Sequence, residues 1–110
     1  MFSGCYKLTS IYLKNFNTNN VIDMTNMFGY CSSLTSIDVS NFNTKNVEKM
    51  NNMFSSCRSL KYIDISSFTT SQQSVSLLSD LPSSGTIIVK TEFYNLISSQ
   101  IPSNWEKILK

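Results

Sequence analysis

The sequence predicts an α/β repeat fold, a short solenoid with a parallel sheet along one wall, short helices along the other and a C-terminal cap. Three observations predict it. The motif of residues 1–26 recurs at a fixed period, each copy changes from alternating to helical apolar spacing, and residues 82–110 abandon the motif. With 110 residues, of which 41% are hydrophobic, the chain is expected to form a single domain, residues 1–110, with one core.

The repeat is clearest in its first two copies. Residues 1–26 and 27–52 are identical at 15 of 26 positions, and residues 27–44 match 53–70 at 10 of 18. The shared skeleton reads M-F-x-x-C-x-x-L-x-x-I-x-(L/V/I)-x-x-F-x-T-x-x-V-x-x-M. A fixed period of this length is typical of stacked repeats, which bury their apolar faces only against one another. We therefore divide the array into repeats 1–26, 27–52 and 53–81, the last degenerate at its end.

Each repeat contains one predicted strand. Ile37 and Val39 alternate with polar residues, as in a short strand with one buried face. The pairs Ile11/Leu13 and Ile63/Ile65 repeat this alternation in the other two copies. Stacking the copies in register places these strands side by side in a parallel sheet, about 4.8 Å apart.

A helix is predicted after each strand. Five apolar residues at helical spacing would share one face of about three turns; they are Val47, Met50, Met53, Phe54 and Cys57. Thr44, like Thr18 one repeat earlier, stands at the expected N-cap, and Glu48 falls in the first turn. One repeat is then a strand, a corner at Phe42, a short helix and a return, which is the plan of a leucine-rich-repeat-type solenoid.

The C-terminal part combines a last strand with a cap. Val75, Leu78 and Leu81 reproduce the Val–Met–Met spacing with a small shift, and "TIIVK" at 86–90 follows "LKYID" at 60–64 by one repeat length. Beyond that strand the sequence carries Phe93, Tyr94 and Trp105, with Thr91 as the expected helix cap. Solenoids need such a unit over their last repeat. The first repeat has none, so Phe2 and Leu8 form a candidate docking edge.

The motif "MFxxCxSLTSIDxSNFNTxNVxxMxxMF" resembles the BspA-type leucine-rich repeat, in the variant first noted in mycoplasma surface proteins of unknown function. The tail "LPSSGTIIVKTEFYNLISSQIPSNW" is similar to the segment that closes such arrays. The resemblance covers almost the whole chain and implies a right-handed solenoid. It also implies an extracellular or cell-surface location and adhesion to proteins or surfaces. The family usually strings together many repeats, whereas this chain has three and a remnant.

Charge and hydrophobicity indicate which classes of binding partner to expect. The net charge is only +2, and the Lys and Arg residues form no cluster. The sequence therefore lacks the concentrated positive charge with which proteins bind nucleic acid or anionic lipid. No apolar run approaches the roughly 20 residues that span a bilayer, and "MFSGCYKLTS" lacks the features of a signal peptide. The expected partner is a protein or glycan, without nucleic acid or membrane insertion. A longer parent chain or a larger assembly stays open.

Residues that recur at the same position in successive repeats are expected to have structural roles. Cys5, Cys31 and Cys57 occupy the same place in three copies, which predicts a column of buried thiols and no metal site or disulfide. Asn41 and Asn43 recur at the corner, where Asn side chains satisfy backbone groups. No metal and no cofactor is predicted.

Catalysis has little support in the sequence. The absence of histidine excludes Ser–His–Asp and Cys–His arrangements. Asp38 and Asp64 align in neighbouring repeats and could be taken for a catalytic carboxylate pair. A glycosidase needs its two carboxylates on either side of a substrate groove, and these two are expected on an open sheet face. We therefore predict that the protein is not an enzyme.

The outward strand positions vary inside the constant skeleton, as recognition residues do. The predicted ligand-binding residues are Tyr12, Lys14, Ser36, Asp38, Ser40, Lys61, Tyr62 and Asp64. Tyr12 and Tyr62 have the amphipathic character of binding hot spots. The sequence thus favours a non-enzymatic binding or adhesion module. The alternative is a structural subunit or terminal module that docks through its first repeat.

Overall fold

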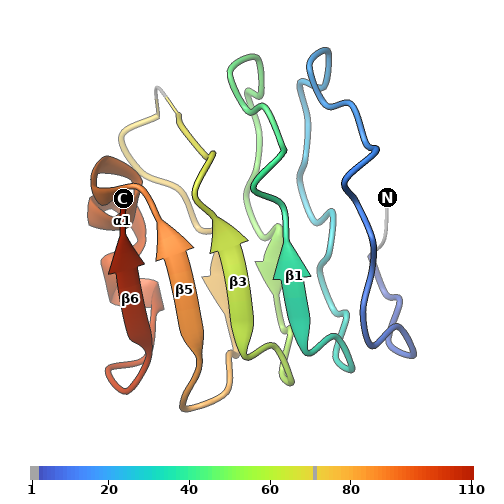
Figure 1. The fold of residues 1–110 in the computed structure, drawn as a ribbon, viewed down its shortest axis with the longest axis vertical. Coiled ribbons are helices and arrows are strands. Elements are labelled where there is room, and N and C mark those ends of the chain that lie inside the picture. The colour runs from blue at the N-terminus through green and yellow to red at the C-terminus, as the bar shows by residue number, and fades with distance from the viewer. Residues whose placement is uncertain (1–2, 71) are drawn as a thin grey trace.

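The computed structural model describes residues 3–70 and 72–110. Successive repeats lie side by side in the order of the sequence (Figure 1). The main sheet contains β1 (Ser36–Asp38), β3 (Tyr62–Ile65), β5 (Thr86–Val89) and β6 (Glu106–Leu109), all parallel and in that order. On the opposite wall, β2 (Phe54–Ser55) pairs in parallel with β4 (Leu78–Ser79). The cap contains α1 (Thr91–Ile97) and the 3-10 turn η1 (Ser98–Gln100).

The register of the main sheet confirms the predicted parallel stacking. Ser36 pairs with Tyr62, Tyr62 with Thr86, and Thr86 with Glu106. The first of these steps equals the repeat period, and each later step is shorter than the one before it. The predicted fourth strand is therefore present as β5, two residues out of the expected register. Strand β6 lies in the segment predicted only as a cap.

The first repeat differs from the prediction, because residues 8–14 form no assigned strand. The second repeat still binds it, since the Thr35 N–H donates to the Thr9 carbonyl over 3.1 Å. Asn41 Nδ2 adds a hydrogen bond of 3.0 Å to the Leu13 carbonyl. Within the described residues this segment has a neighbour on one side only, so its ladder is too sparse for a regular strand.

The predicted helices on the opposite wall are absent from residues 44–57, and this prediction is wrong. The Met24 and Phe28 N–H groups donate to the carbonyls of Lys49 and Met53, at 2.7 and 2.9 Å. A helix would direct them four residues back along their own chain. Asn26 and Asn52 also have φ near +60°, which ends a right-handed helix. This wall is therefore a series of tight turns that bond sideways to the next repeat.

Thr18 and Thr44 are not helix caps either. The Thr18 hydroxyl donates to the Asn43 carbonyl (3.1 Å) and accepts from the Asn43 N–H (2.8 Å). Thr44 makes the same two bonds to Thr69, both at 2.9 Å. Both threonines are buried, so each ties the corner of its own repeat to the corner of the next.

The core follows the repeat as predicted. Phe28 and Phe54 stack with ring centroids 5.5 Å apart and planes at 6°. Residues that the sequence assigned to the helical face are buried even though the helix is absent, because three-residue turns direct them inward just as well. Buried members include Leu34, Leu60, Ile37, Ile63, Phe42, Phe68, Val47, Met50 and Met53.

The cap closes the C-terminal end of the core. Trp105 is buried, and its indole N–H donates to the Pro82 carbonyl over 2.8 Å. Phe93 of α1 meets Phe68 edge-on, with centroids 5.8 Å apart. Thr91 is the first residue of α1, not its N-cap, and its hydroxyl donates to the Lys110 carbonyl over 3.3 Å.

Repeat 53–81 ends differently from its predicted alignment. Phe54 pairs with Leu78, and the fully buried Leu77 therefore stands in line with Met53. Leu81, which the spacing assigned to that place, is only half-buried. The predicted alignment makes this repeat two residues longer than the 26-residue period, whereas the pairing of Phe54 with Leu78 makes it two residues shorter.

Candidate functional site

The outer face of the main sheet carries two rows of side chains. The register aligns Ser36, Tyr62, Thr86 and Glu106 in one row, and Asp38, Asp64, Ile88 and Ile108 in the other. Successive side chains of a strand point to opposite faces, and the intervening Ile37 and Ile63 are buried. Both rows therefore face away from the core. We call these rows, with Tyr12, Lys14, Ser40 and Lys61, the strand face.

The two tyrosines of the strand face are accessible. Tyr12, the first-repeat counterpart of Asp38, is 72% exposed, and Tyr62 is 38% exposed. Partial burial raises the pKa of Tyr62, and the negative charges of Asp64 and Asp38 raise it further. The Tyr62 hydroxyl therefore stays protonated at neutral pH and can donate a hydrogen bond.

The two aspartates occupy neighbouring strands. Asp38 Oδ1 accepts hydrogen bonds from the Ser40 hydroxyl (2.6 Å) and the Ser40 N–H (2.9 Å). These bonds lower the pKa of Asp38, and the Lys14 charge adds to the effect. Asp64 Oδ1 accepts from the Ser66 N–H at 3.0 Å. Each carboxylate is thus oriented by the turn that follows its strand.

The other predicted residues lie in, flank or precede the two rows of side chains and are accessible. Ser36, Ser40, Lys14 and Lys61 are all exposed. The candidate docking edge was predicted from two further residues. Leu8 is half-buried in the first repeat, and Phe2 lies outside the described residues.

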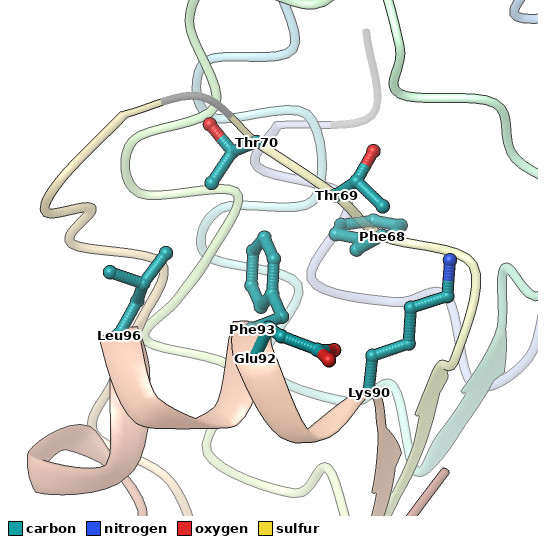
Figure 2. A pocket seen from close by; sticks show the side chains of 7 residues that line it. All are labelled: Phe68, Thr69, Thr70, Lys90, Glu92, Phe93 and Leu96. Carbon is teal, nitrogen blue, oxygen red and sulfur yellow. The ribbon is translucent and has the colours of Figure 1, made fainter.

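A small cavity lies elsewhere, between the corner after β3 and helix α1 (Figure 2). It has a volume of about 100 Å³ and is lined by Phe68, Thr69, Thr70, Lys90, Glu92, Phe93 and Leu96. Neither Asp38 nor Asp64 lines it. The sequence analysis missed it, because it arises where α1 crosses the corner at Phe68, which no repeat pattern predicts.

The cysteine column is packed as predicted at two of its three positions. The three cysteines form no disulfide with one another; Cys31 and Cys57 are buried and Cys5 is half-buried. The Cys57 thiol donates to the Phe28 carbonyl over 3.1 Å, and burial raises the pKa of Cys57 to about 12. Burial also raises the pKa of Cys31. Protonated, buried thiols are poor nucleophiles and poor metal ligands.

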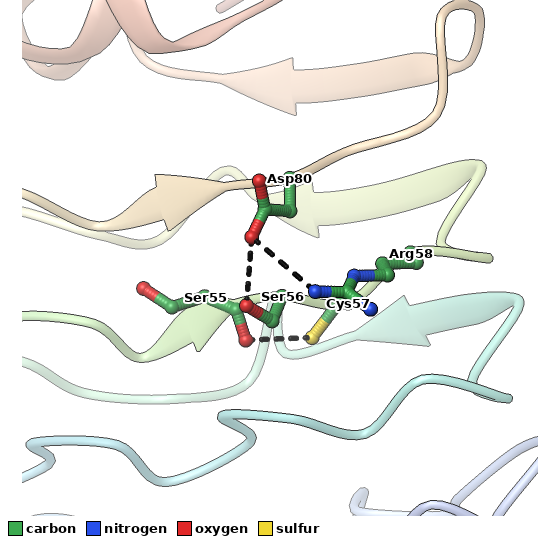
Figure 3. Close-up of polar contacts among 5 residues, drawn as sticks. All are labelled: Ser55, Ser56, Cys57, Arg58 and Asp80. Carbon is green, nitrogen blue, oxygen red and sulfur yellow. Dashed lines mark hydrogen bonds and ion pairs between the residues drawn. The ribbon is translucent and has the colours of Figure 1, made fainter.

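A polar cluster joins the turn after β2 to the turn after β4. The Ser56 hydroxyl donates to Asp80 Oδ2 over 2.9 Å, and Arg58 Nη2 lies 3.9 Å from the same oxygen (Figure 3). The Arg58 and Asp80 side chains are 70% and 57% exposed, so their ion pair contributes little to stability. Ser56 and Asp80 occupy equivalent positions in successive turns, both with positive φ, so this cluster links one turn to the next.

No three His, Cys, Asp or Glu side chains in residues 3–70 and 72–110 gather as a metal ion would require. Within the same ranges, no helix is long and apolar enough to cross a membrane.

Comparison with known proteins places the chain in a family. A family model described as "Mycoplasma protein of unknown function, DUF285" matches residues 1–80. The chain belongs to this DUF285 family. The matched region contains the repeat array with β1 to β4, whereas β5, α1 and β6 lie beyond it. No curated protein and no solved structure matches the DUF285 chain.

Proposed function

We propose that the protein is a non-enzymatic binding module that recognises a protein or glycan through its strand face. The observation that carries this proposal is the register, which aligns Asp38 with Asp64 and places Tyr62 in the adjacent row. Tyr12, at 72% exposure, extends the same face into the first repeat. Tyrosines supply contact area with little entropy cost, and the oriented carboxylates supply hydrogen-bond acceptors.

The repeat architecture supports the choice of this face. We infer a short right-handed solenoid of the BspA-like leucine-rich-repeat type, at or outside the cell surface. In solenoids the sheet formed by successive repeats is the usual recognition surface. A non-enzymatic role is supported by the lack of histidine and by a cavity lining that includes neither Asp38 nor Asp64.

The experiment is a triple substitution, Tyr12→Ala, Asp38→Ala and Tyr62→Ala. The unmodified protein is first screened against arrays of immobilised glycans and extracellular proteins. We expect the triple variant to lose at least about tenfold in affinity for any ligand found, because hot-spot truncations each cost more than about 1 kcal/mol. Its melting temperature should change little, since these side chains lie outside the core.

The matched control is Tyr6→Ala with Asp23→Ala, an exposed tyrosine and an exposed aspartate away from the strand face. This control is expected to bind like the unmodified protein. Equal binding by the triple variant would show that the ligand uses another surface.

A second candidate is a structural subunit that docks through its first repeat. Leu8 is half-buried, whereas its counterparts Leu34 and Leu60 are fully buried. A neighbouring subunit would complete the burial of Leu8. Substituting Leu8→Asp should then disperse the assembly, which the sedimentation experiment below also measures.

A further inference from the structure

Strand β6 forms one end of the main sheet and has a free side (Figure 1). Its alternate residues bond to β5. The Glu106 N–H donates to the Gly85 carbonyl (2.8 Å), and the Lys110 N–H donates to the Val89 carbonyl (2.9 Å). In a parallel ladder the intervening residues point their backbone groups the other way. The N–H and C=O groups of Lys107 and Leu109 therefore face outward, where the described residues supply no strand.

The edge is ordered and apolar. The Lys110 carbonyl accepts from both the N–H and the hydroxyl of Thr91, each at 3.3 Å, so the strand is held to its last residue. Ile108 is 40% exposed beside Ile88, and Leu109 is 47% exposed on the other face of the strand. An ordered edge with exposed apolar side chains is a template for pairing with another strand.

We propose that β6 pairs antiparallel with β6 of a second copy, about a two-fold axis at Ile108. This register places Ile108 opposite itself, Glu106 opposite Lys110, and Lys107 opposite Leu109. The last two carry the outward backbone groups, so they form the two hydrogen-bonded pairs of an antiparallel ladder. Four main-chain hydrogen bonds result, and each exposed apolar side chain gains a neighbour.

Charge complementarity selects this register. Two Glu106–Lys110 pairs flank the central isoleucines, one on each side of the axis. Within one copy, no described carboxylate lies in ion-pair distance of Lys110, and no described cation in that of Glu106. Centring the axis on Lys107 would oppose two lysines. Centring it on Leu109 would place Lys110 opposite Ile108.

Two features of the chain make a strand of a second copy a suitable occupant. A lysine on an edge strand normally discourages pairing, but the Lys107 ammonium donates to the Ser103 carbonyl of its own loop over 3.2 Å. Helix α1 already covers the end of the core through the buried Phe93 and Ile97. A further whole repeat has no core to stack on, whereas a single strand needs only the sheet edge.

The resulting dimer joins two four-stranded sheets into one. Its contact is a short strand on each side, smaller than a standard stable interface of about 1,600 Å². Association is therefore expected to be reversible, with a dissociation constant of about 10 μM or weaker. The inference does not depend on the strand-face ligand.

The test is sedimentation velocity of the full chain from about 10 μM to 1 mM, the range where small interfaces associate. Glu106→Lys and Lys110→Glu should each weaken association about tenfold, since each converts both ion pairs into repulsions. Mixing the two variants should restore association, because every facing pair is then opposite in charge. The double variant should also recover it. Glu92→Lys, on the exposed face of α1, is the matched control and should behave as the unmodified protein.

The proposal is overturned if the unmodified chain stays monomeric throughout this range while its circular dichroism shows a folded protein. It is also overturned if both charge reversals leave association unchanged while Leu8→Asp abolishes it, which would place the contact on the first repeat. Leu109→Pro provides an independent check. It removes one outward N–H without touching a bond to β5, and it should also abolish association.

Discussion

At the scale of single residues, the most regular feature is a turn position with left-handed backbone. Gly4, Tyr30, Ser56 and Asp80 occupy equivalent places in four successive turns, and their φ values lie between 54° and 77°. Glycine adopts this conformation freely, whereas other L-residues pay about 1–2 kcal/mol. The fold imposes the conformation on three residues that disfavour it, because the chain must reverse there to begin the next strand.

Tyr30 is the least suited of these residues and is 60% exposed, so its side chain contributes little burial. Substituting Tyr30→Gly should raise the free energy of unfolding by about 0.5–1 kcal/mol, after the entropy cost of a new glycine is subtracted. Urea denaturation measures the change. Tyr6→Gly is the control, because Tyr6 is equally exposed and does not have positive φ. It should be neutral or destabilising, and a loss of stability in Tyr30→Gly would contradict the strain argument.

The sequence predicts the residues whose burial follows from alternating apolar and polar positions. It does not predict the residues whose role depends on a left-handed backbone conformation. Ile37 and Val39 were placed in the core because a period of two has one structural meaning. Tyr30 carried no signal, since only Gly4 marks the left-handed position and the other copies bear three unrelated residues there. The strand-face residues are predicted from their variability, but the bonds that orient Asp38 depend on the path of the turn, which no sequence pattern specifies.

At the scale of elements, the wall opposite the main sheet shows why the helix prediction failed. Val47, Met50 and Met53 are three residues apart, a spacing that a helix and a series of tight turns share. The backbone decides between them, and here its N–H groups bond to the next repeat. On this wall the N–H groups of each repeat donate to carbonyls of the following repeat. At β4, the last strand of the wall, the N–H groups therefore need acceptors from outside the repeat array.

Gln100 supplies those acceptors. Its Oε1 accepts from the N–H groups of Leu77 (2.8 Å) and Leu78 (2.9 Å), and its Nε2 donates to the Val75 carbonyl (2.6 Å). One side chain thus imitates the edge of a missing strand. No sequence pattern predicted this, because a single glutamine after α1 has no distinguishing context.

Gln100→Ala should lower the free energy of unfolding by about 2–4 kcal/mol, since it leaves three backbone groups unpaired in a half-buried setting. Thermal or urea denaturation measures the loss. Gln100→Glu keeps the acceptor and loses the donor, so it should fall between alanine and the unmodified chain. Ser99→Ala, at an exposed neighbour, is the control and should change stability by less than about 0.5 kcal/mol. Equal stability of Gln100→Ala and Ser99→Ala would remove the capping role.

At the scale of the whole molecule, the sequence predicted the stacking order and the sheet but not the end of the sheet. The repeat period fixes which residues neighbour each other from one repeat to the next. The 26-residue period no longer holds at β5, because Tyr62 pairs with Thr86 and not with Ile88. The sequence separation between paired residues of β5 and β6 is shorter still. The segment EKIL at 106–109 lacks the alternation of the other strands, so only the structure reveals the edge on which dimerisation is proposed.

If the array is a solenoid, its repeats are interchangeable. A second copy of residues 27–52 inserted after Asn52 would meet the same kind of neighbour on each side as the original does. Repeat stability is a sum of unit and interface terms, so one added unit should raise both the free energy of unfolding and the urea m-value. The m-value scales with the surface exposed on unfolding, so one added repeat should increase it by roughly a quarter.

A scrambled insert made from the same residues is the control, because it has the same composition without the repeat pattern. It should form a disordered loop that leaves the m-value nearly unchanged and does not raise stability. The informative contrast is between the two inserts. An ordered repeat extends the ladder of Thr18, Thr44 and Thr69 by one further threonine bridge, whereas the scrambled segment adds none. If both inserts behave alike, the repeats are not independent units and the chain folds as an indivisible domain.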